Sequence, residues 1–331
     1  MYVDDVICRG NPTATNAFYE GLSKRFDCKD PSYLTYGCPL HFVGFDIHMD
    51  KYKDGTDVIS IDQQDSISEF LNIHSAKPIK NITSPMTTNY IDPDSEPLSN
   101  SDMTTYRSIV GSLNYFAMYS RWDISYAASR LCQDNNKPTQ ASWKAMRRVL
   151  SYLLATNDFK ITGKFMSGNN NLKSYSDSNI ADDNSATTRS QTGTMIMLNN
   201  VPIHWKSKTQ CKTSKSPAQA EIYALSNTLD DARDMRFRLQ DLNITVNKRL
   251  TIYTDNTQAE AFTKSTCVRS RLRGVFSRHE GWVRELKEDG ELDCRHVAAK
   301  YNAANIFTKP LVAVNYSAEK RLISEHWFVA A

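Results

Sequence analysis

Two alternating apolar runs around Asn199-Asn200, followed by a long amphipathic helix, constrain the fold of this chain more than any other feature. Thr194–Leu198 and Val201–Trp205 have the pattern of paired strands, and the two asparagines between them favour a tight hairpin turn. A helix is expected after Pro217, because apolar residues recur there at spacings of three and four. Its inward-facing positions are Ile222, Leu225, Leu229 and Ala232.

The rest of the second half extends this hairpin into a larger sheet. Further strands are expected at Leu172–Ser176, Leu250–Thr254 and Leu292–Val297, and short helices near 257–264, 276–289 and 302–308. The order is three antiparallel strands, a helix, a strand, helices, a strand and a helix. It predicts an α/β (mixed α+β) fold, in which helices cover the faces of a mixed five-stranded sheet.

The first half predicts a small sheet followed by helices. His41–Ile47 alternates as one strand, and Ile59–Ile61 is expected to pair with it after a turn at Asp54-Gly55. Asp62 is expected to cap a helix that runs through Ile73. A polar loop at 75–105, helices at 106–119 and 124–132, and an amphipathic helix after Thr139 complete the pattern.

The composition is that of a globular protein rather than a disordered one. Apolar residues make up 40% and charged residues 23% of the 331 residues, a length that suggests two or so domains. The seven cysteines occur singly, which argues against a disulfide framework or a zinc site and fits a reducing compartment. Residues 166–315 carry 21 Lys and Arg against 16 Asp and Glu, an excess that mildly favours a polyanionic partner.

Three acids of the second half occupy positions that a sheet flanked by a helix can bring to one point. Asp177 closes the first strand, Glu221 lies in the first turn of the long helix, and Asp255 follows the strand at Leu250–Thr254. Clustered carboxylates repel one another, and a divalent cation removes that repulsion. Oxygen ligands suit Mg²⁺, and two such ions about 3.5–4 Å apart support phosphodiester hydrolysis.

Each acid also has a plainer interpretation. Asp177 can be one polar residue among several in SDSNIADDNS, and Asp255 can simply cap the helix that follows it. Glu221 can serve the dipole at the helix N-terminus. Only the joint pattern of the three favours a metal site.

Six ordered segments of the second half carry a family resemblance. They read YSDSNIADD, TRSQTG, VPIHWKSKTQ, SPAQAEIYALS, IYTDNTQA and NIFTKPL. Together they resemble the RNase H domain of copia-type LTR-retrotransposon Pol polyproteins. The resemblance implies that Asp177, Glu221 and Asp255 are catalytic, metal-binding acids of an RNase H-like fold, with Mg²⁺ or Mn²⁺ as cofactor and no small-molecule cofactor.

The first half is similar to the same family. YVDD at 2–5 resembles the catalytic strand turn of the reverse transcriptase palm, and HFVGFDI resembles the strand near the primer terminus. The resemblance implies a palm remnant at 1–60, a thumb or connection region at 61–165, an RNase H-like domain at 166–315 and a tail at 316–331. Because the chain begins at the YVDD motif, Asp4 and Asp5 are expected to be the remnant of a polymerase site, in a poorly paired first strand.

Several positions depart from the family pattern. The fourth acid of the metal site is replaced by Asn305, which retains a ligand oxygen but removes a negative charge. His279 does not align with the usual histidine, and Arg121-Trp122-Asp123 replaces the usual Arg-Pro-Asp. We therefore expect Asn305→Asp to raise metal affinity and cleavage.

Two functions are compatible with this sequence. One is a Mg²⁺-dependent RNase H that cleaves RNA in RNA–DNA hybrids during replication of the element. The other is a catalytically impaired element fragment that only binds nucleic acid. The resemblance implies an RNA–DNA hybrid or other nucleic acid and other Pol or Gag products as partners, no membrane, and a location in cytoplasmic virus-like particles or the nucleus.

Two basic stretches are candidates for phosphate contacts, which carry no base information. The first comprises Lys206, Lys208, Lys212 and Lys215, and the second Arg269, Arg271 and Arg273. The plainer interpretation is solvated surface charge. Salt-dependent binding of a hybrid distinguishes the two interpretations.

Overall fold

The computed structural model describes residues 5–88, 90, 92, 94–164, 170–180, 188–257 and 277–325. The chain forms two compact units. Unit 1 comprises Met1–Ser66 and Asp158–Phe165, and unit 2 comprises Ile67–Asn157 and Met166–Ala331. Most of the expected connection region thus folds together with the expected RNase H-like domain.

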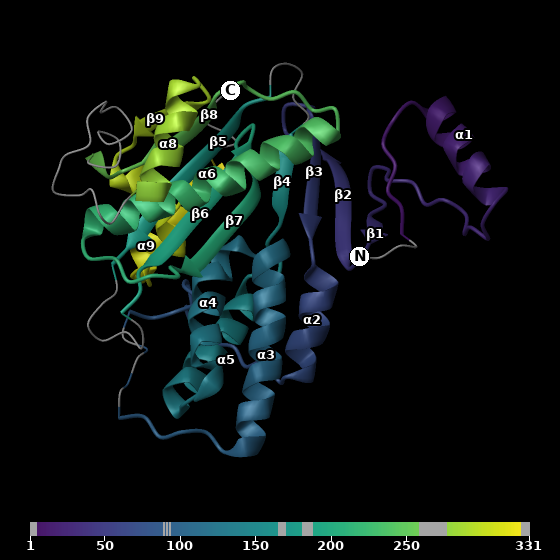
Figure 1. Ribbon diagram of the computed structural model, residues 1–331. Helices are drawn as coiled ribbons and strands as arrows, with labels where there is room; N and C mark the ends of the chain where they lie inside the picture. The colour runs from purple at the N-terminus through teal and green to yellow at the C-terminus, as the bar shows by residue number, and fades with distance from the viewer. Residues whose placement is uncertain are drawn as a thin grey trace. The chain divides into compact units, whose positions relative to one another are not determined.

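Unit 1 contains a helix and a four-stranded antiparallel sheet (Figure 1). The helix α1 spans Pro12–Ser23. The strands are β1 (Leu40–Phe42), β2 (Phe45–Lys51), β3 (Asp57–Asp62) and β4 (Ile161–Lys164), in that spatial order. β4 reaches this sheet from much later in the chain and was not expected from the sequence.

The prediction of one strand at His41–Ile47 is wrong, because this run turns back on itself. Val43 and Gly44 have φ values of 50° and 79°, so they form a tight turn between β1 and β2. The pairing of the second arm with the next strand is confirmed, since Ile47 lies opposite Ile61. Alternating hydrophobicity alone did not reveal the turn, because Val disfavours positive φ.

The start of unit 1 bears on the expected polymerase motif. Asp4 lies outside the described residues, and Asp5 is exposed. Residues 5–10 form neither a helix nor a strand. The described part of the motif therefore has no strand partner, and the expectation for residues 2–4 stays a prediction.

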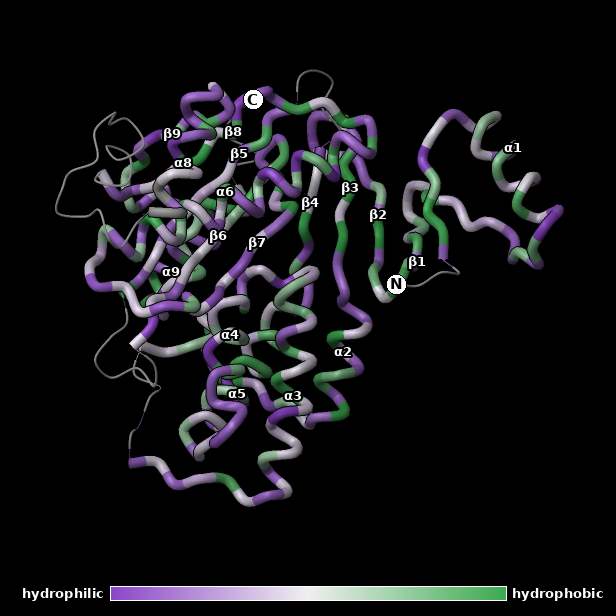
Figure 2. Tube along the Cα trace, viewed as in Figure 1, coloured by the Kyte–Doolittle hydropathy of each residue, from purple (hydrophilic) through white to green (hydrophobic). Residues whose placement is uncertain are grey.

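The helical part of unit 2 is built on a buried apolar core. Its helices are α2 (Gln64–Ile73, which starts in unit 1), α3 (Asn100–Tyr119), α4 (Ser125–Gln133) and α5 (Gln140–Ala155), with short 3-10 turns at Trp122–Ile124 and Asp134–Asn136. α3 begins earlier than expected because Ser99 caps it by accepting a hydrogen bond from the backbone N–H of Asp102. Figure 2 shows hydrophobic and hydrophilic stretches alternating along α3 and α5, as one-sided burial requires.

The second part of unit 2 confirms the predicted mixed five-stranded sheet. Its strands are β5 (Leu172–Asn179), β6 (Gln191–Leu198), β7 (Val201–Thr209), β8 (Leu250–Thr254) and β9 (Leu292–His296). The spatial order is β7-β6-β5-β8-β9, in which the first three strands are antiparallel and the last two run parallel to β5. Asn199 and Asn200 have φ values of 51° and 66°, which confirms the expected hairpin turn.

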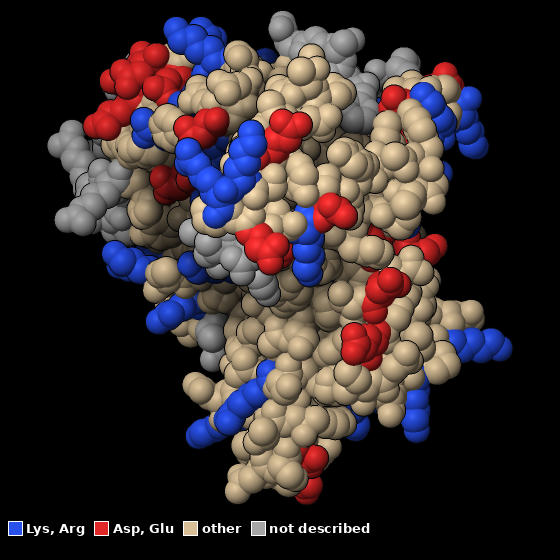
Figure 3. Space-filling model, turned by 90° about the vertical axis from the view of Figure 1, so that its right-hand side faces the viewer, with Lys and Arg blue, Asp and Glu red and all other residues tan. Residues whose placement is uncertain are grey.

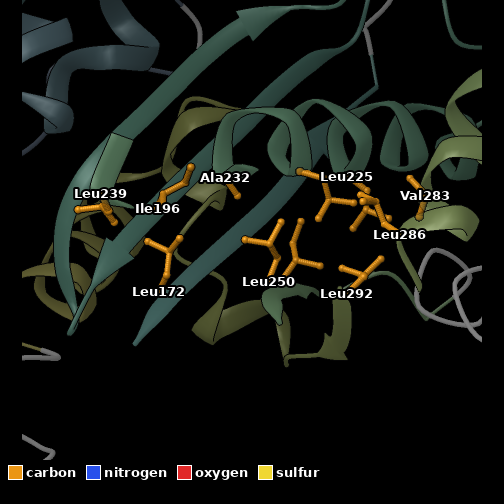
Figure 4. Close-up of a cluster of buried hydrophobic side chains, with 11 residues drawn as sticks. Leu172, Ile196, Leu225, Ala232, Leu239, Leu250, Val283, Leu286 and Leu292 are labelled. Carbon is orange, nitrogen blue, oxygen red and sulfur yellow. The ribbon is translucent and has the colours of Figure 1, made fainter. Parts of the chain in front are cut away.

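One long helix covers this sheet and closes its core. α6 (Pro217–Asp241) is capped by Ser216, and α8 (Ser277–Glu288) packs beside it (Figure 1). Figure 4 shows Leu225 and Ala232 of α6 facing side chains of the sheet and of α8. The buried cluster comprises Leu172, Ile196, Leu225, Leu229, Ala232, Leu239, Leu250, Ile252, Val283, Leu286 and Leu292.

The helical part and this sheet share an interface at the β7 edge. Trp205 of β7 donates its indole N–H to the carbonyl of Ala117 in α3 (2.6 Å). Gln133 of α4 donates to the hydroxyl of Thr209 (2.7 Å). An uncovered edge strand invites pairing with other chains, so this cover stabilises the unit and protects its edge.

The end of unit 2 differs from the expectation in two places. The helix expected at 302–308 consists of 3-10 turns at Ala299–Tyr301 and Asn305–Phe307, because the Asn302 side chain accepts from the backbone N–H of Ala304 and donates to the carbonyl of Ser176. Residues expected to begin a tail lie in α9 (Ala313–Glu325). None of the described helices has the length and apolar character needed to cross a membrane.

Candidate metal centre

Three acids from different elements of unit 2 meet near the carboxyl ends of β5 and β8 in the five-stranded sheet. β5 and β8 are parallel neighbours in which Tyr175 lies opposite Tyr253. Asp177 and Asp255 each lie two residues beyond this pair, so they come close together near the carboxyl ends of the two strands. Glu221 joins them from the first turn of α6. One ligand oxygen from each acid lies within 4.8 Å of the others, which confirms the prediction that the three are close enough to share a metal.

Burial and mutual repulsion make this cluster unfavourable for three bare carboxylates. Asp177 is 4% exposed and Glu221 is 8% exposed. Burial, with the negative charges of Asp177 and Asp255, raises the pKa of Glu221 to about 8. Burial is also the main cause that raises the pKa of Asp177 to about 6, and the charge of Asp255 adds to it.

A few polar groups hold these carboxylates in place. The hydroxyl of Thr308 donates to Oδ2 of Asp177, and the backbone carbonyl of Asn305 accepts from the same hydroxyl. The hydroxyl of Ser178 hydrogen-bonds to Glu221 and lowers its pKa. These contacts oppose the effect of burial only in part, since both pKa values stay above their ordinary range.

Two buried oxygens at the cluster lack a hydrogen-bond partner among the described residues. They are Oε2 of Glu221 and Oδ1 of Asn305. A buried acceptor without a partner is costly, and natural proteins rarely leave one unless another group satisfies it. A set of oxygen donors with a net negative charge fits a hard cation such as Mg²⁺.

Asn305, the residue at the position of the family's fourth acid, is 4% exposed. Its amide nitrogen donates to the carbonyl of Ala299 (2.6 Å), which leaves Oδ1 as the free end of the amide among the described residues. The sequence placed this residue in the metal site, and the structure places it beside Thr308, which contacts Asp177.

Gly193 allows the segment that carries Asn305 to approach the sheet. It lies opposite Asp177 in the β5–β6 pairing. A Cβ atom at this position would lie 2.5 Å from the carbonyl oxygen of Ala304 and 2.7 Å from Cγ2 of Thr308. Any larger residue would push away the segment that orients Asp177, so the glycine of the TRSQTG motif has a direct structural reason.

The predicted basic stretches have different outcomes. Lys206 is paired with Asp231 (2.8 Å), whereas Lys208, Lys212 and Lys215 are exposed. The second stretch, Arg269, Arg271 and Arg273, lies outside the described residues. On the face shown in Figure 3, basic side chains occur in small groups separated by acidic and uncharged surface.

Sequence reasoning missed three residues near the cluster. Thr308 contacts Asp177 directly, and Lys309 acts on the same carboxylate by lowering its pKa. Both belong to the NIFTKPL motif, so the motif itself was a signal that they lie at the site. Burial and the charges of Asp177 and Asp255 also raise the pKa of Glu319 in α9. It was assigned to a tail, and no pattern in the sequence links it to the site.

Comparison with known proteins identifies the family. The chain is 31% identical to the retrovirus-related Pol polyprotein from transposon RE2 of Arabidopsis thaliana over 98% of its length, and 31% identical to that from transposon RE1 over 94%. The chain belongs to the copia-type retrotransposon Pol family. It spans about a fifth of the length of these curated relatives, 21% and 20% respectively.

Two further comparisons concern family models and solved structures. No protein-family model matches the chain. Among solved structures, LC11-RNase H1, crystallised in complex with an RNA/DNA hybrid, is similar with a TM-score of 0.31 and 13% identity. The match covers 42% of the Pol chain and 93% of that protein.

Proposed function

We propose that this Pol chain is a Mg²⁺-dependent ribonuclease H that cleaves the RNA strand of RNA–DNA hybrids during replication of a retrotransposon. The observation that carries the proposal is the convergence of Asp177, Glu221 and Asp255, with oxygens that have no partner among the described residues. Hydrophobic packing does not explain such a cluster, because three neighbouring acids, two of them buried, repel one another. Membership in the Pol family supports the same activity.

The residues at this site would have different roles. Asp177, Glu221 and Asp255 would hold Mg²⁺, or Mn²⁺ in its place, with Oδ1 of Asn305 as a neutral donor. When bound, two such ions activate a water and stabilise the leaving oxygen in phosphodiester hydrolysis. Thr308 fixes the orientation of Asp177, and Gly193 lets Thr308 come close enough to do so. Burial of the acids strengthens their attraction for a cation.

A hybrid would be held mainly by its phosphates. Lys208, Lys212 and Lys215 are exposed at and just after the end of β7, where a flexible lysine can reach a backbone phosphate. Lys206 is held by Asp231 and would contribute less. Arg269, Arg271 and Arg273 stay candidates for the same role.

The wider assignment follows from the family. Residues 1–60 would derive from the palm, 61–165 from the thumb or connection region and 166–315 from the RNase H domain. Asp4 and Asp5 would belong to the polymerase motif. The working location would be a cytoplasmic virus-like particle or the nucleus, with other products of the element as partners.

Asn305 favours a second candidate function. A neutral residue at the position of the fourth acid lowers the negative charge available to a cation. The chain would then bind nucleic acid without cleaving it.

Cleavage of a labelled RNA strand in an RNA–DNA hybrid tests the first function against the second. The full chain should cut the hybrid with Mg²⁺ or Mn²⁺ but leave a DNA duplex of the same sequence intact. Asp177→Asn should abolish cleavage, whereas Asp234→Asn, at an exposed position on α6, should not. Hybrid binding without metal-dependent cleavage would support the second function, and cleavage that survives in Asp177→Asn would contradict the proposed site.

A further inference from the structure

The C-terminal helix α9 is anchored to the helical part of unit 2 by buried polar contacts. The hydroxyl of Tyr316 donates to the backbone carbonyl of Asp123 (2.6 Å). The ammonium of Lys320 donates to Oδ2 of Asp123 (3.1 Å) and to the hydroxyl of Tyr152 (2.7 Å). Tyr316 is 4% exposed, so these contacts exclude most water and fix one face of α9.

The anchored face also carries a carboxylate that the sequence gave no reason to notice. Glu319 lies three residues after Tyr316 and four before the buried Ile323, which places it on the packed side of the helix. Oε2 of Glu319 is buried and has no hydrogen-bond partner among the described residues. A solvated glutamate kept for solubility would not be in this position.

The surroundings of Glu319 connect it to the metal centre. α9 packs against the 3-10 turn Asn305–Phe307. Burial, together with the charges of Asp177 and Asp255, raises the pKa of Glu319 to about 7, although Lys309 and Asn305 act against the rise. Asn305 itself is 4% exposed with Oδ1 unpartnered among the described residues. Two buried oxygens, one on Asn305 and one on Glu319, therefore lack a partner among the described residues where α9 packs against the turn of Asn305.

We propose that Glu319 supplies, from α9, the negative charge that the metal centre lacks because position 305 is an asparagine. This inference rests on the proposed metal-dependent function. Glu319 is not in the group of acids whose ligand atoms lie within 4.8 Å of one another, so it is a positioning residue rather than a further member of that group. Its carboxylate orients the Asn305 amide and adds negative charge near a bound cation. It can also accept hydrogen bonds from water molecules that the cation retains.

The proposal changes what Asn305→Asp should do. With Glu319 in place, an aspartate at 305 adds a carboxylate against an existing one, so the gain in metal affinity should be small. Once Glu319 is neutral, the same substitution should restore the missing charge. The effects of the two substitutions on metal affinity should therefore depend on each other.

Calorimetric titration of the full chain with Mg²⁺, and in parallel with Mn²⁺, tests this without measuring activity. Glu319→Gln should weaken metal binding about tenfold, as loss of an outer partner of a metal ligand does. Asn305→Asp in the Glu319→Gln background should recover most of that loss. Glu288→Gln, at an exposed position at the end of α8, is the control and should leave the affinity unchanged.

Asp177→Asn separates failure of this inference from failure of the proposed function. If Asp177→Asn does not weaken metal binding, the metal centre itself is wrong. If Asp177→Asn weakens binding and Glu319→Gln does not, only the role of Glu319 is overturned. Circular dichroism identifies a variant that fails to fold. If Glu319→Gln fails to fold, Glu319→Asp is measured in its place, and its metal affinity should lie within a fewfold of that of the natural chain. Loss of affinity in Glu319→Gln without recovery by Asn305→Asp would also overturn the proposal.

Discussion

The buried acids Asp123 and Asp177 of unit 2 lie in opposite environments. Asp123 is 3% exposed, and its carboxylate accepts hydrogen bonds from the guanidinium of Arg121 (2.9 Å) and from Tyr152 (2.8 Å), with Lys320 close by. Arg121 and Lys320 hold its pKa well below the usual range despite burial. At the metal centre, burial and like charges raise the pKa of Asp177 and Glu221.

This difference separates a structural acid from a candidate binding acid. The partners of Asp123 are Arg121, just before η1 (Trp122–Ile124), Tyr152 of α5 and Lys320 of α9, so its charge stabilises the packing of these segments. The acids of the metal centre have too few hydrogen-bond donors around them, so their charge is available to a ligand. Burial alone therefore does not identify a site; a buried charge without enough partners does.

The largest expected effect is loss of stability on Asp123→Asn. This substitution removes the carboxylate charge beside Arg121, which is 1% exposed. Breaking a buried ion pair from one side destabilises a protein by about 3–5 kcal/mol. Urea unfolding of the full chain at pH 7, compared with Asp234→Asn, measures the loss. A change below about 1 kcal/mol would mean that the Asp123 contacts do not hold the unit together.

The sign of the pH dependence follows from the same group. A carboxyl whose folded-state pKa is lowered stabilises the protein fully above its unfolded pKa of about 4. That contribution is lost as the pH falls from there towards the lower folded-state pKa. Asp123→Asn should therefore lose less stability than the natural chain between about pH 4 and pH 2.

Glu221→Gln should have the next largest effect, and in the opposite direction. In the metal-free chain the raised pKa means that this carboxylate destabilises the fold as the pH rises from about 4 towards about 8. Replacement by a neutral amide should then stabilise the metal-free chain by about 1–3 kcal/mol at pH 8.

Thermal unfolding with and without Mg²⁺ checks this expectation. The natural chain should gain stability from Mg²⁺, and Glu221→Gln should gain much less. Glu288→Gln should match the natural chain in both conditions. A metal-free Glu221→Gln chain that is less stable than the natural one would show that Glu221 is a satisfied structural residue, like Asp123.

The sequence predicted the acids of the metal centre better than the contacts around Asp123. Hydrophobic periodicity and the Asn199-Asn200 turn were enough for the five-stranded sheet, and strand ends placed Asp177 and Asp255 together. Arg121-Trp122-Asp123 was interpreted only as a departure from the family. Besides Arg121, Asp123 is contacted by Lys320, almost two hundred residues away, and no local pattern encodes that contact.

The same limit explains the other errors. Glu319 lies on the packed side of α9, which is anchored to Asp123 through Tyr316. The 3-10 turns near Asn305 depend on the long-range bond from the Asn302 side chain to Ser176. Contacts of this kind are set by tertiary packing, and local propensity carries little information about them.

Gly193→Ala should have an intermediate effect on stability and on metal binding. The added methyl group would clash with the backbone of Ala304 and with Thr308, so this segment must shift away from Asp177. We expect a loss of about 1–3 kcal/mol and weaker Mg²⁺ binding. Gly111→Ala on α3, where the methyl group meets open space, is the matched control and should be neutral or slightly stabilising. Equal stability of the two variants would contradict the close packing at Gly193.

The smallest effects should come from single lysines on the surface. Lys208→Ala, Lys212→Ala and Lys215→Ala should each weaken hybrid binding only modestly and lower the slope of log affinity against log salt by about 1, as loss of one phosphate contact does. Lys206→Ala should change this slope less, because Asp231 already neutralises Lys206. Fluorescence anisotropy with a labelled hybrid, in buffer without divalent metal and at several salt concentrations, measures these slopes. If the natural chain binds with no salt dependence, these lysines are solvated surface charges, and any contribution of the chain to hybrid binding comes from elsewhere.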